Sequence, residues 1–305
     1  MGKIVIVGSL NMDFVVNVKH MPKGGETISG SSLSLIPGGK GANQAFSAGR
    51  CGADIAMIGA IGDDSYGQTL VNNLASAGVD VSGVEVMENT PTGTAFINVS
   101  EDAENSIVIV AGANGKVDRA LVDRHMDLID ACDIVVMQLE IPLDTVQYVA
   151  VEAKKRGKMV ILDPAPAPDF LPDELVAQLD ILKPNETELG KLANASTDTL
   201  EEVFAAARKM MAEKGVKTII ATRGSHGSVA ITPDEIIEVA AQKVKAVDTT
   251  AAGDSYTAAL ATWLAKGESL REAMEFAGKF AGVVTTRKGA QSSIPTLEEV
   301  EEFYK

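Results

Sequence analysis

Short apolar strands that alternate with amphipathic helices constrain the fold of this chain most. The runs predicted as strands are almost continuously apolar, and they are Lys3–Gly8, Ile134–Met137, Met159–Asp163, Asp180–Lys183 and Thr218–Thr222. Continuous apolar character is typical of strands that are covered on both faces. Helices are predicted between them, for example over Leu143–Arg156 and Thr199–Lys214. This order predicts a doubly wound, mostly parallel α/β sheet, whose ligands bind beyond the carboxyl ends of the strands.

Two stretches break this alternation and predict a second, smaller sheet. From about 13 to 35, and again from about 94 to 110, the residues alternate or turn without a long helical period. Within the second stretch, TAFINVS and NSIVIV predict antiparallel strands joined by the polar turn from Glu101 to Asn105. We expect the two stretches to form a β-sheet lid that excludes water from the ligand site. The alternative is that they are edge strands of the main sheet.

Length and cysteine usage predict one cytoplasmic domain. The 305 residues contain no linker-like segment, so we expect a single domain over residues 1–305. No apolar run approaches the ~20 residues of a membrane span, and the start MGKIVIVG lacks the pattern of a secretory signal. Cys51 and Cys132 lie far apart, which argues against a disulfide framework and against a zinc site. We therefore expect a soluble protein of a reducing cytoplasm.

The net charge of −15 limits the classes of partner. So acidic a chain opposes binding to nucleic acid or to an anionic membrane, because both depend on an excess of Lys and Arg. A nucleotide would be repelled as well, unless backbone N–H groups, metal cations or a few basic side chains receive its phosphates. The three histidines show no metal-ligand spacing. Nucleic acid and membranes are therefore not expected as partners.

The segment VDTTAAGDSYTAA, from Val247 to Ala259, carries the most specific chemistry. Three small residues precede Asp254 on the first turn of a helix predicted to run to about Lys266. Small residues leave the N–H groups of a helix N-terminus uncovered, and these groups attract an anion. A carboxylate does not improve anion binding, so it suggests a base beside a place where negative charge develops. The structural alternative is a tight loop followed by an acid that complements the helix dipole.

A glycine-rich segment, IPGGKGANQA from Ile36 to Ala45, precedes an amphipathic helix that ends near Arg50. Glycine lets a backbone approach a ligand closely, although the segment is neither a Walker loop nor a dinucleotide fingerprint. It could equally be a structural turn. Amide and carboxylate side chains suited to sugar hydroxyls lie in this segment and after two predicted strands, at Asn43, Asn11, Asp13 and Glu140.

Two further segments follow predicted strands directly. In KPNETE, Asn185 and Glu188 are one helical turn apart and could hold a hydrated Mg²⁺ against phosphate oxygens. The structural alternative is that they cap a helix. In TRGSHG, from Thr222 to Gly227, small and polar residues could form a loop along a nucleotide.

The order NMD, GGKGANQA, QLE, KPNETE, TRGSHG, DTTAAGD and TRKGAQSSIP resembles the ribokinase family of sugar kinases over essentially the whole chain. The resemblance implies ATP-dependent phosphorylation of the terminal hydroxyl of ribose, giving ribose 5-phosphate. Two alternatives remain. The acceptor could be deoxyribose, a hexose or a nucleoside, or the protein could be a sugar-binding regulator that has lost phosphoryl transfer.

The resemblance also implies a role for each matching position. Asp254 matches the general base, and the anion hole beside it matches Ala251, Ala252 and Gly253. The positions that hold the sugar match Asn11, Asp13, Gly39, Lys40, Asn43, Glu140 and Asp254. The positions that organise ATP, with Mg²⁺ bound through water, match Asn185 and Glu188, and a nucleotide-binding loop matches Thr222, Gly224 and Ser225.

The family further implies K⁺ as an activating cation and a homodimer formed through the lid. The cation ligands match the side chains of Asp248 and Ser293 and the backbone carbonyls of Thr250, Val284, Arg287 and Gly289. Such an ion would offset the acidic surroundings without a basic side chain. The alternative for Asp248 is a turn cap. Dimerisation through the lid would also cover the open edge that a small β-sheet leaves.

Overall fold

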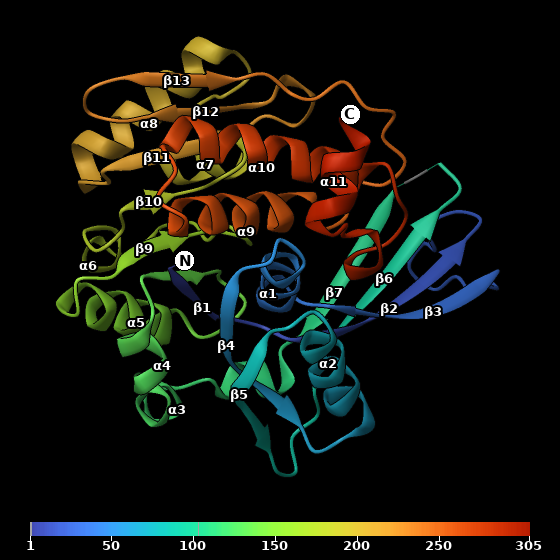
Figure 1. Ribbon diagram of the computed structural model, residues 1–305. Helices are drawn as coiled ribbons and strands as arrows, with labels where there is room; N and C mark the ends of the chain where they lie inside the picture. The colour runs from blue at the N-terminus through green and yellow to red at the C-terminus, as the bar shows by residue number, and fades with distance from the viewer. Residues whose placement is uncertain (1, 103) are drawn as a thin grey trace.

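The computed structural model describes residues 2–102 and 104–305, and over these the strands form two separate sheets (Figure 1). The larger has nine strands within the described residues. In spatial order these are β13 (Ile236–Val239), β12 (Ser228–Ile231), β11 (Thr218–Thr222), β10 (Ile181–Leu182), β9 (Met159–Leu162), β8 (Ile134–Met137), β1 (Lys3–Val7), β4 (Asp54–Gly62) and β5 (Asp80–Met87).

The predicted, mostly parallel sheet is confirmed. All neighbours from β11 across to β5 run parallel, and only β12 and β13 at one edge are antiparallel. The predicted strands agree with the observed ones to within one residue at each end. The strand predicted over Asp180–Lys183 is shorter, because Pro184 cannot donate a hydrogen bond to a neighbouring strand.

Helices cover both faces of the large sheet, so the strands contribute to two hydrophobic cores. In β1, Val5 and Val7 face one core, whereas Ile4 and Ile6 face the other. The first core lies under α3 (Arg119–Arg124), α4 (Met126–Ala131), α5 (Leu143–Lys155), α6 (Asp173–Val176), α7 (Glu186–Ala193) and α8 (Leu200–Lys214). The second lies under α1 (Lys40–Arg50), α2 (Ser65–Ser76), α9 (Ala252–Ala265), α10 (Leu270–Thr285) and α11 (Leu297–Phe303).

Local signals in the sequence set the ends of the helices. Helix α8 begins after Thr199, whose hydroxyl accepts from the N–H of Glu202 while the Glu202 carboxylate accepts from the N–H of Thr199. The helix ends at Gly215, which takes the left-handed conformation that glycine adopts without strain. None of the helices within the described residues is long and apolar enough to cross a membrane.

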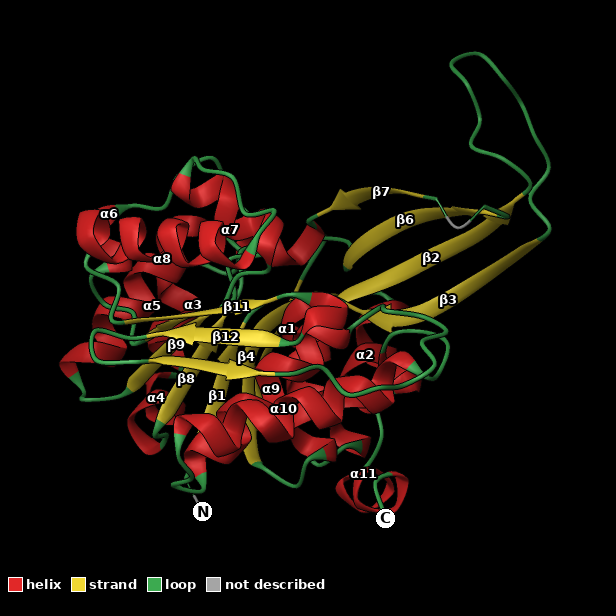
Figure 2. Ribbon diagram, turned by 90° about the horizontal axis from the view of Figure 1, so that it is seen from above, coloured by secondary structure: helices red, strands yellow, loops and turns green. Residues whose placement is uncertain are grey.

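The smaller sheet contains both stretches that break the helical pattern. Its strands, in spatial order, are β3 (Ser32–Gly38), β2 (Asn11–Val18), β6 (Gly93–Ser100) and β7 (Asn105–Val110). It projects from the body of the molecule (Figure 2). The predicted antiparallel pair is confirmed as β6 and β7, and the alternative of edge strands in the main sheet is wrong. Within the predicted turn from Glu101 to Asn105, Ala103 lies outside the described residues.

The small sheet begins at the carboxyl edge of the large one. Strand β1 ends at Val7, and β2 begins at Asn11 after three residues. At this root Asn11 pairs with Gly38 of β3 on one side and with Gly93 of β6 on the other. The polar residues at the start of β2 therefore lie where the parallel strands end, which is where α/β sheets bind ligands.

Candidate active site

The N-terminus of α9 offers free backbone N–H groups. Ala251 precedes the helix with φ +60°, and the N–H of Ala252 donates to Thr249 O at 3.2 Å. Among the described residues, the N–H groups of Gly253 and Asp254 have no backbone acceptor. A Cβ at Gly253 would meet only the Lys183 Nζ, at 3.9 Å. An anion can therefore approach these N–H groups closely. Of the three predicted anion-hole residues, Ala252 already uses its N–H in the hydrogen bond to Thr249 O.

Asp254 occupies the first turn of α9 and is 7 % exposed. Its Oδ2 accepts from Asn43 Nδ2 at 3.0 Å and its Oδ1 from Gln44 Nε2 at 3.2 Å. Burial raises the pKa of Asp254, the positive charge of Lys40 opposes this rise, and the negative charge of Asp163 adds to it. A carboxylate with a raised pKa is a stronger proton acceptor than one in water.

The glycine-rich segment places Lys40 among carboxylates. Gly39 precedes α1 with φ +87°, and a Cβ there would lie 2.7 Å from the backbone N of Asn11, so only glycine fits. Burial alone would lower the pKa of Lys40, but four carboxylates raise it. These belong to Asp254, Asp163, Glu140 and Glu188. The lysine therefore stays charged at the point where the acidic groups converge.

Glu140 and Asp13 complete a group of side chains that we call the polar cluster, and its other members are Asn11, Lys40, Asn43 and Asp254. Glu140 Oε2 accepts from Ser9 Oγ at 2.6 Å and from the N–H of Lys40 at 3.0 Å. The pKa of Asp13 is raised to about 7, first because the half-buried side chain is partly desolvated, then because Glu140 and Asp254 repel its negative charge. The structure thus brings the predicted sugar-binding residues together, at the root of the small sheet.

A buried ion pair beside Asp254 was not predicted. Lys183 Nζ lies 2.9 Å from Asp163 Oδ2, and both side chains are less than 5 % exposed. The same Oδ2 accepts from Gln44 Nε2 and from Thr257 Oγ1, both at 3.1 Å, whereas Oδ1 has no partner among the described residues. Each charged residue directly follows a buried strand, β9 or β10. The same sequence signal that identified Glu140 could have found them.

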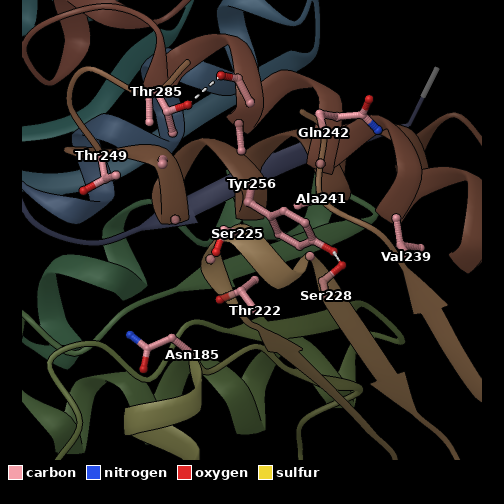
Figure 3. A pocket seen from close by; sticks show the side chains of 18 of the residues that line it. Asn185, Thr222, Ser225, Ser228, Val239, Ala241, Gln242, Thr249, Tyr256 and Thr285 are labelled. Carbon is pink, nitrogen blue, oxygen red and sulfur yellow. Dashed lines mark hydrogen bonds between the residues drawn. The ribbon is translucent and has the colours of Figure 1, made fainter. Parts of the chain in front are cut away.

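A cavity of about 540 Å³ lies on the other side of the α9 N-terminus (Figure 3). The backbones of Asn185 and Thr222 form a parallel β-bridge, which places the KPNETE and TRGSHG segments side by side. Of the predicted nucleotide-binding residues, Asn185, Thr222, Gly224 and Ser225 line the cavity, and Glu188 does not. Ala252 and Gly253 also line it. The cavity therefore reaches the helix turn that carries Asp254.

The remaining walls of the cavity were not predicted. Tyr256 reaches into the wall, and its hydroxyl donates to Ser228 Oγ at 2.8 Å (Figure 3). One face of α10 contributes only small residues, namely Gly278, Ala281, Gly282 and Thr285. Their spacing of three and four residues along a helix is a sequence signal that could have found this wall.

Asn185 and Glu188 cap the start of α7. The N–H of Asn185 donates to Glu188 Oε2, and the N–H of Glu188 donates to Asn185 Oδ1, both at 2.8 Å. The structural alternative from the sequence therefore describes the observed geometry. Among the described residues, no group of three or more His, Cys, Asp or Glu side chains could hold a metal. A Mg²⁺ at this point would take most of its ligands from phosphates and water.

Asp248 and two of its predicted companions are in direct contact. Asp248 Oδ1 accepts from the N–H and the hydroxyl of Thr250 at 2.9 and 2.6 Å, and Oδ2 accepts from the N–H of Gly289 at 2.9 Å. Burial would raise the pKa of Asp248, but these hydrogen bonds lower it. The carboxylate is therefore held ionised, and the turn-cap alternative also describes its contacts with Thr250.

The other predicted cation ligands lie on neighbouring segments. The N–H of Asp248 donates to Thr285 O at 3.2 Å, which places the end of α10 and Val284 close by. Val284 O accepts from the N–H of Arg287 at 3.1 Å, and Ser293 Oγ donates to a backbone carbonyl. Within the described residues, no hydrogen bond joins Ser293 to Asp248. The donor set is one carboxylate, one hydroxyl and several carbonyls, which are oxygen ligands suited to an alkali cation.

Known proteins resemble this chain along nearly all of its length. Ribokinase from Haemophilus influenzae is 40% identical over 300 residues, covering 98% of this chain and 97% of that protein. Deoxyribokinase from Salmonella typhi is 36% identical over 300 residues, covering 98% of each. The structure of Arabidopsis thaliana ribokinase complexed with ribose and ATP superposes with a TM-score of 0.93 at 36% identity, covering 100% of this chain and 99% of that one.

A family model agrees with these relatives. The model of the pfkB family of carbohydrate kinases matches residues 1–297. The motifs that resembled sugar kinases, from the glycine-rich segment to the C-terminal segment, all lie within this match. The chain therefore belongs to the pfkB family of carbohydrate kinases.

Proposed function

We propose that the protein transfers the terminal phosphoryl group of ATP to the terminal hydroxyl of ribose, giving ribose 5-phosphate. One observation carries the proposal. A single turn of α9 presents the Asp254 carboxylate together with the open N–H groups, between the polar cluster and the cavity. Transfer of a phosphoryl group to an alcohol needs this combination of a base, donors for developing charge and two adjoining sites.

The residues of the polar cluster have separate tasks in this proposal. Asn11, Asp13 and Asn43 hold hydroxyls of the sugar, so that the terminal hydroxyl lies against Asp254. Asp254 then takes the proton from this hydroxyl as its oxygen attacks the phosphoryl group. The N–H groups of Gly253 and Asp254 stabilise the charge on the transferring group. Positioning of the two substrates supplies much of the remaining rate enhancement.

The cavity would receive the nucleotide. Thr222, Gly224 and Ser225 would lie along it, and its phosphates would point to the N-terminus of α9. Mg²⁺ would neutralise phosphate charge. Glu188 could reach it through water, because only Oε2 is used in the cap of α7. K⁺ would bind at Asp248 with the nearby hydroxyl and carbonyls, and would offset the acidic surroundings.

The choice of acceptor is tested by a panel of sugars. Both a ribokinase and a deoxyribokinase are relatives at similar identity, so ribose, deoxyribose, a hexose and a nucleoside are compared. We expect ribose to give the highest kcat/KM for sugar-dependent ADP release, and K⁺ to raise it. A higher kcat/KM with another acceptor would reassign the substrate. No sugar-dependent ADP release with any of these acceptors, with sugar binding retained, would favour a regulator.

The small sheet serves as the lid in this proposal and belongs to one domain over residues 1–305. Its root is shared with the large sheet, since β2 follows β1 after three residues. Asp13 lies on it and belongs to the polar cluster. A lid that carries a sugar-binding residue would close as the sugar binds, and it would exclude water from the phosphoryl group. A single cooperative unfolding transition would support the one-domain assignment.

A homodimer through the small sheet is the proposed assembly. Large apolar side chains on its strands are about half exposed, and they are Leu33, Leu35, Phe96, Ile107, Val108, Ile109 and Val110. All of β7 is exposed, and such an edge is usually covered in a native protein. We expect a dimer by light scattering and a monomer after Val108→Asp. A monomeric wild-type protein at working concentration would contradict the dimer.

The reducing cytoplasm is the proposed location. Cys51 and Cys132 are both buried and free. Burial raises the pKa of the Cys51 thiol above its usual value and that of Cys132 to about 11, so both stay protonated and unreactive. Cell fractionation that places the protein outside the cytoplasm would contradict this assignment.

A further inference from the structure

Asn114 joins the two sheets through its side-chain amide. It lies in the 3₁₀ turn Gly112–Lys116, directly after β7, and is 1 % exposed. Its Oδ1 accepts from the N–H of Leu10 at 2.9 Å. Its Nδ2 donates to Leu10 O at 3.0 Å and to Asn11 Oδ1 at 2.7 Å. All three hydrogen bonds go to the segment in which the chain leaves the large sheet for the small one.

This segment needs an amide, because Leu10 lies between β1 and β2 and belongs to neither sheet. Among the described residues, its backbone N–H and carbonyl have no backbone partner. A buried peptide group must be paired, and a carboxamide can accept and donate at once as a neighbouring strand would. Asn114 therefore supplies Leu10 with the hydrogen bonds that a neighbouring strand would otherwise give.

The hydrogen bonds fix the orientation of both amides. Since the N–H of Leu10 can only donate and its carbonyl can only accept, the Asn114 amide cannot be reversed. Its Nδ2 then faces Asn11, which must present an oxygen in return. The Nδ2 of Asn11 is the free end, and it has no hydrogen-bond partner among the described residues.

Crowding around the two amides prevents other arrangements. A Cβ at Gly93 would lie 2.1 Å from Asn114 Nδ2 and 2.4 Å from Asn11 Oδ1. A Cβ at Gly112, which has φ +51°, would lie 2.4 Å from Pro91 O. The start of β2, the start of β6 and the turn after β7 therefore converge on the Asn114 amide with little free space.

We propose that Asn114 is a positioning residue that keeps the Asn11 amide turned with its NH₂ group towards the sugar. This inference rests on the proposed function, in which Asn11 binds a hydroxyl. The nearby Asp13 and Glu140 can accept hydrogen bonds from hydroxyls when ionised but cannot donate. A hydroxyl that donates to a carboxylate still has lone pairs to satisfy, and Asn11 supplies the donor. The site thus selects a polyol hydroxyl at that position.

The test compares sugar and nucleotide affinities in Asn114→Asp. The second carboxylate oxygen of this variant would face Leu10 O and Asn11 Oδ1, so the Asn11 amide would turn round to donate to it. The sugar would then meet an oxygen. We expect the KM for ribose to rise about tenfold, the size of one lost hydrogen bond, with the KM for ATP unchanged. Asn17→Asp, at an exposed position on β2, adds the same charge and should change neither KM.

Coupling to Asn11 separates positioning from a purely structural role. In an Asn11→Ala background, Asn114→Asp should change the KM for ribose less than twofold, because the amide that it orients is gone. Asn114→Ala, which adds no charge, should raise the KM for ribose about threefold, since it frees the Asn11 amide to rotate. A folded Asn114→Asp with an unchanged KM for ribose, or one in which both KM values rise alike, would overturn the inference. Failure of both Asn114 variants to fold would also overturn it in favour of a structural role.

Ribose binding by calorimetry keeps this test distinct from that of the proposed function. Binding needs no turnover, so the same tenfold weakening is expected in Kd even if the wild-type protein released no ADP. If the wild-type protein showed no ribose-dependent turnover, only the proposed function would be contradicted. An unchanged Kd in folded Asn114→Asp would contradict only the inference on Asn114.

Discussion

The two sides of the α9 N-terminus are built in opposite ways. The proposed nucleotide side is a cavity of about 540 Å³ whose walls are mainly small or uncharged residues. The proposed sugar side is the polar cluster, in which carboxylates surround Lys40 and accept hydrogen bonds from neighbouring amides and hydroxyls. The nucleotide side therefore depends on its shape and its backbone N–H groups, whereas the sugar side depends on buried charges. A larger side chain should impair the nucleotide side most, and the loss of a balancing charge should impair the sugar side most.

The contrast has an energetic meaning. Small residues can line a cavity at little cost, whereas buried charges are stable only when paired and hydrogen-bonded. On the sugar side, Asp163 is paired with Lys183, but the pKa of Asp13 is raised to about 7 by burial and by its acidic neighbours. Burial and repulsion of carboxylates therefore raise the free energy of the empty sugar side, and hydrogen bonds from hydroxyl groups of a ligand could lower it.

Lys183→Met tests the charge balance and should have the largest effect on stability. It would leave Asp163 as a buried, unpaired charge, and we expect the free energy of unfolding to fall by about 3–5 kcal/mol. Urea unfolding measures this value. Lys217→Met is the matched control, because Lys217 is exposed and Asp180 keeps its ion pair with Lys154, so the loss should be about 0–1 kcal/mol.

A double variant sharpens the same prediction. Asp163→Asn in the Lys183→Met background removes the unpaired charge and should restore part of the lost stability. If Lys183→Met and the wild type unfold with the same midpoint urea concentration, the buried ion pair does not stabilise the fold as described.

Gly253→Val tests the opposite property of the nucleotide side. The side chain would cover the N–H groups at the start of α9, and we expect kcat to fall about 10²- to 10³-fold. Folding should be retained, because a Cβ there meets no atom closer than 3.9 Å. Gly253→Ala, with its smaller side chain, should lose less. Normal turnover by Gly253→Val would show that these N–H groups do not act on the transferring group.

Asp13→Asn tests the repulsion within the polar cluster through pH. A pKa raised to about 7 in the folded protein means that Asp13 favours folding at low pH, and that this contribution is lost as pH rises through 7. The variant should therefore gain stability over the wild type by roughly 2 kcal/mol more at pH 8 than at pH 5, after a discount for solvent screening. Urea unfolding at both pH values measures the difference. If the stability difference between the variant and the wild type were equal at pH 5 and pH 8, Asp13 would not be subject to this repulsion.

The sequence predicted those features that depend on local pattern. Continuous apolar runs located the parallel strands, and the break in helical period located the small sheet. The AAGD segment located the start of α9, because small residues before a carboxylate have a direct meaning at a helix N-terminus. The capping alternative for Asn185 and Glu188 was also local, and it describes their observed contacts.

Features that depend on pairing between distant segments were not predicted. Asp163 and Lys183 meet only because β9 and β10 are neighbours in the sheet. Asn114 reaches Leu10 across 104 positions of the chain, because the turn after β7 returns to the root of the small sheet. No periodicity within either segment reveals the partner. The wall of the cavity on α10 differs, because the spacing of its small residues is a local signal and only the segments that it faces are distant in the sequence.

Turnover by Asp254→Asn, measured together with ribose binding, tests the central claim most directly. The amide keeps the size of the side chain but cannot take a proton, so kcat should fall about 10²- to 10⁴-fold. The Kd for ribose should stay within a few-fold of the wild type, because Asn11, Asp13 and Asn43 still hold the sugar. Near-normal turnover by folded Asp254→Asn would contradict the assignment of Asp254 as the base that accepts the proton of the sugar hydroxyl.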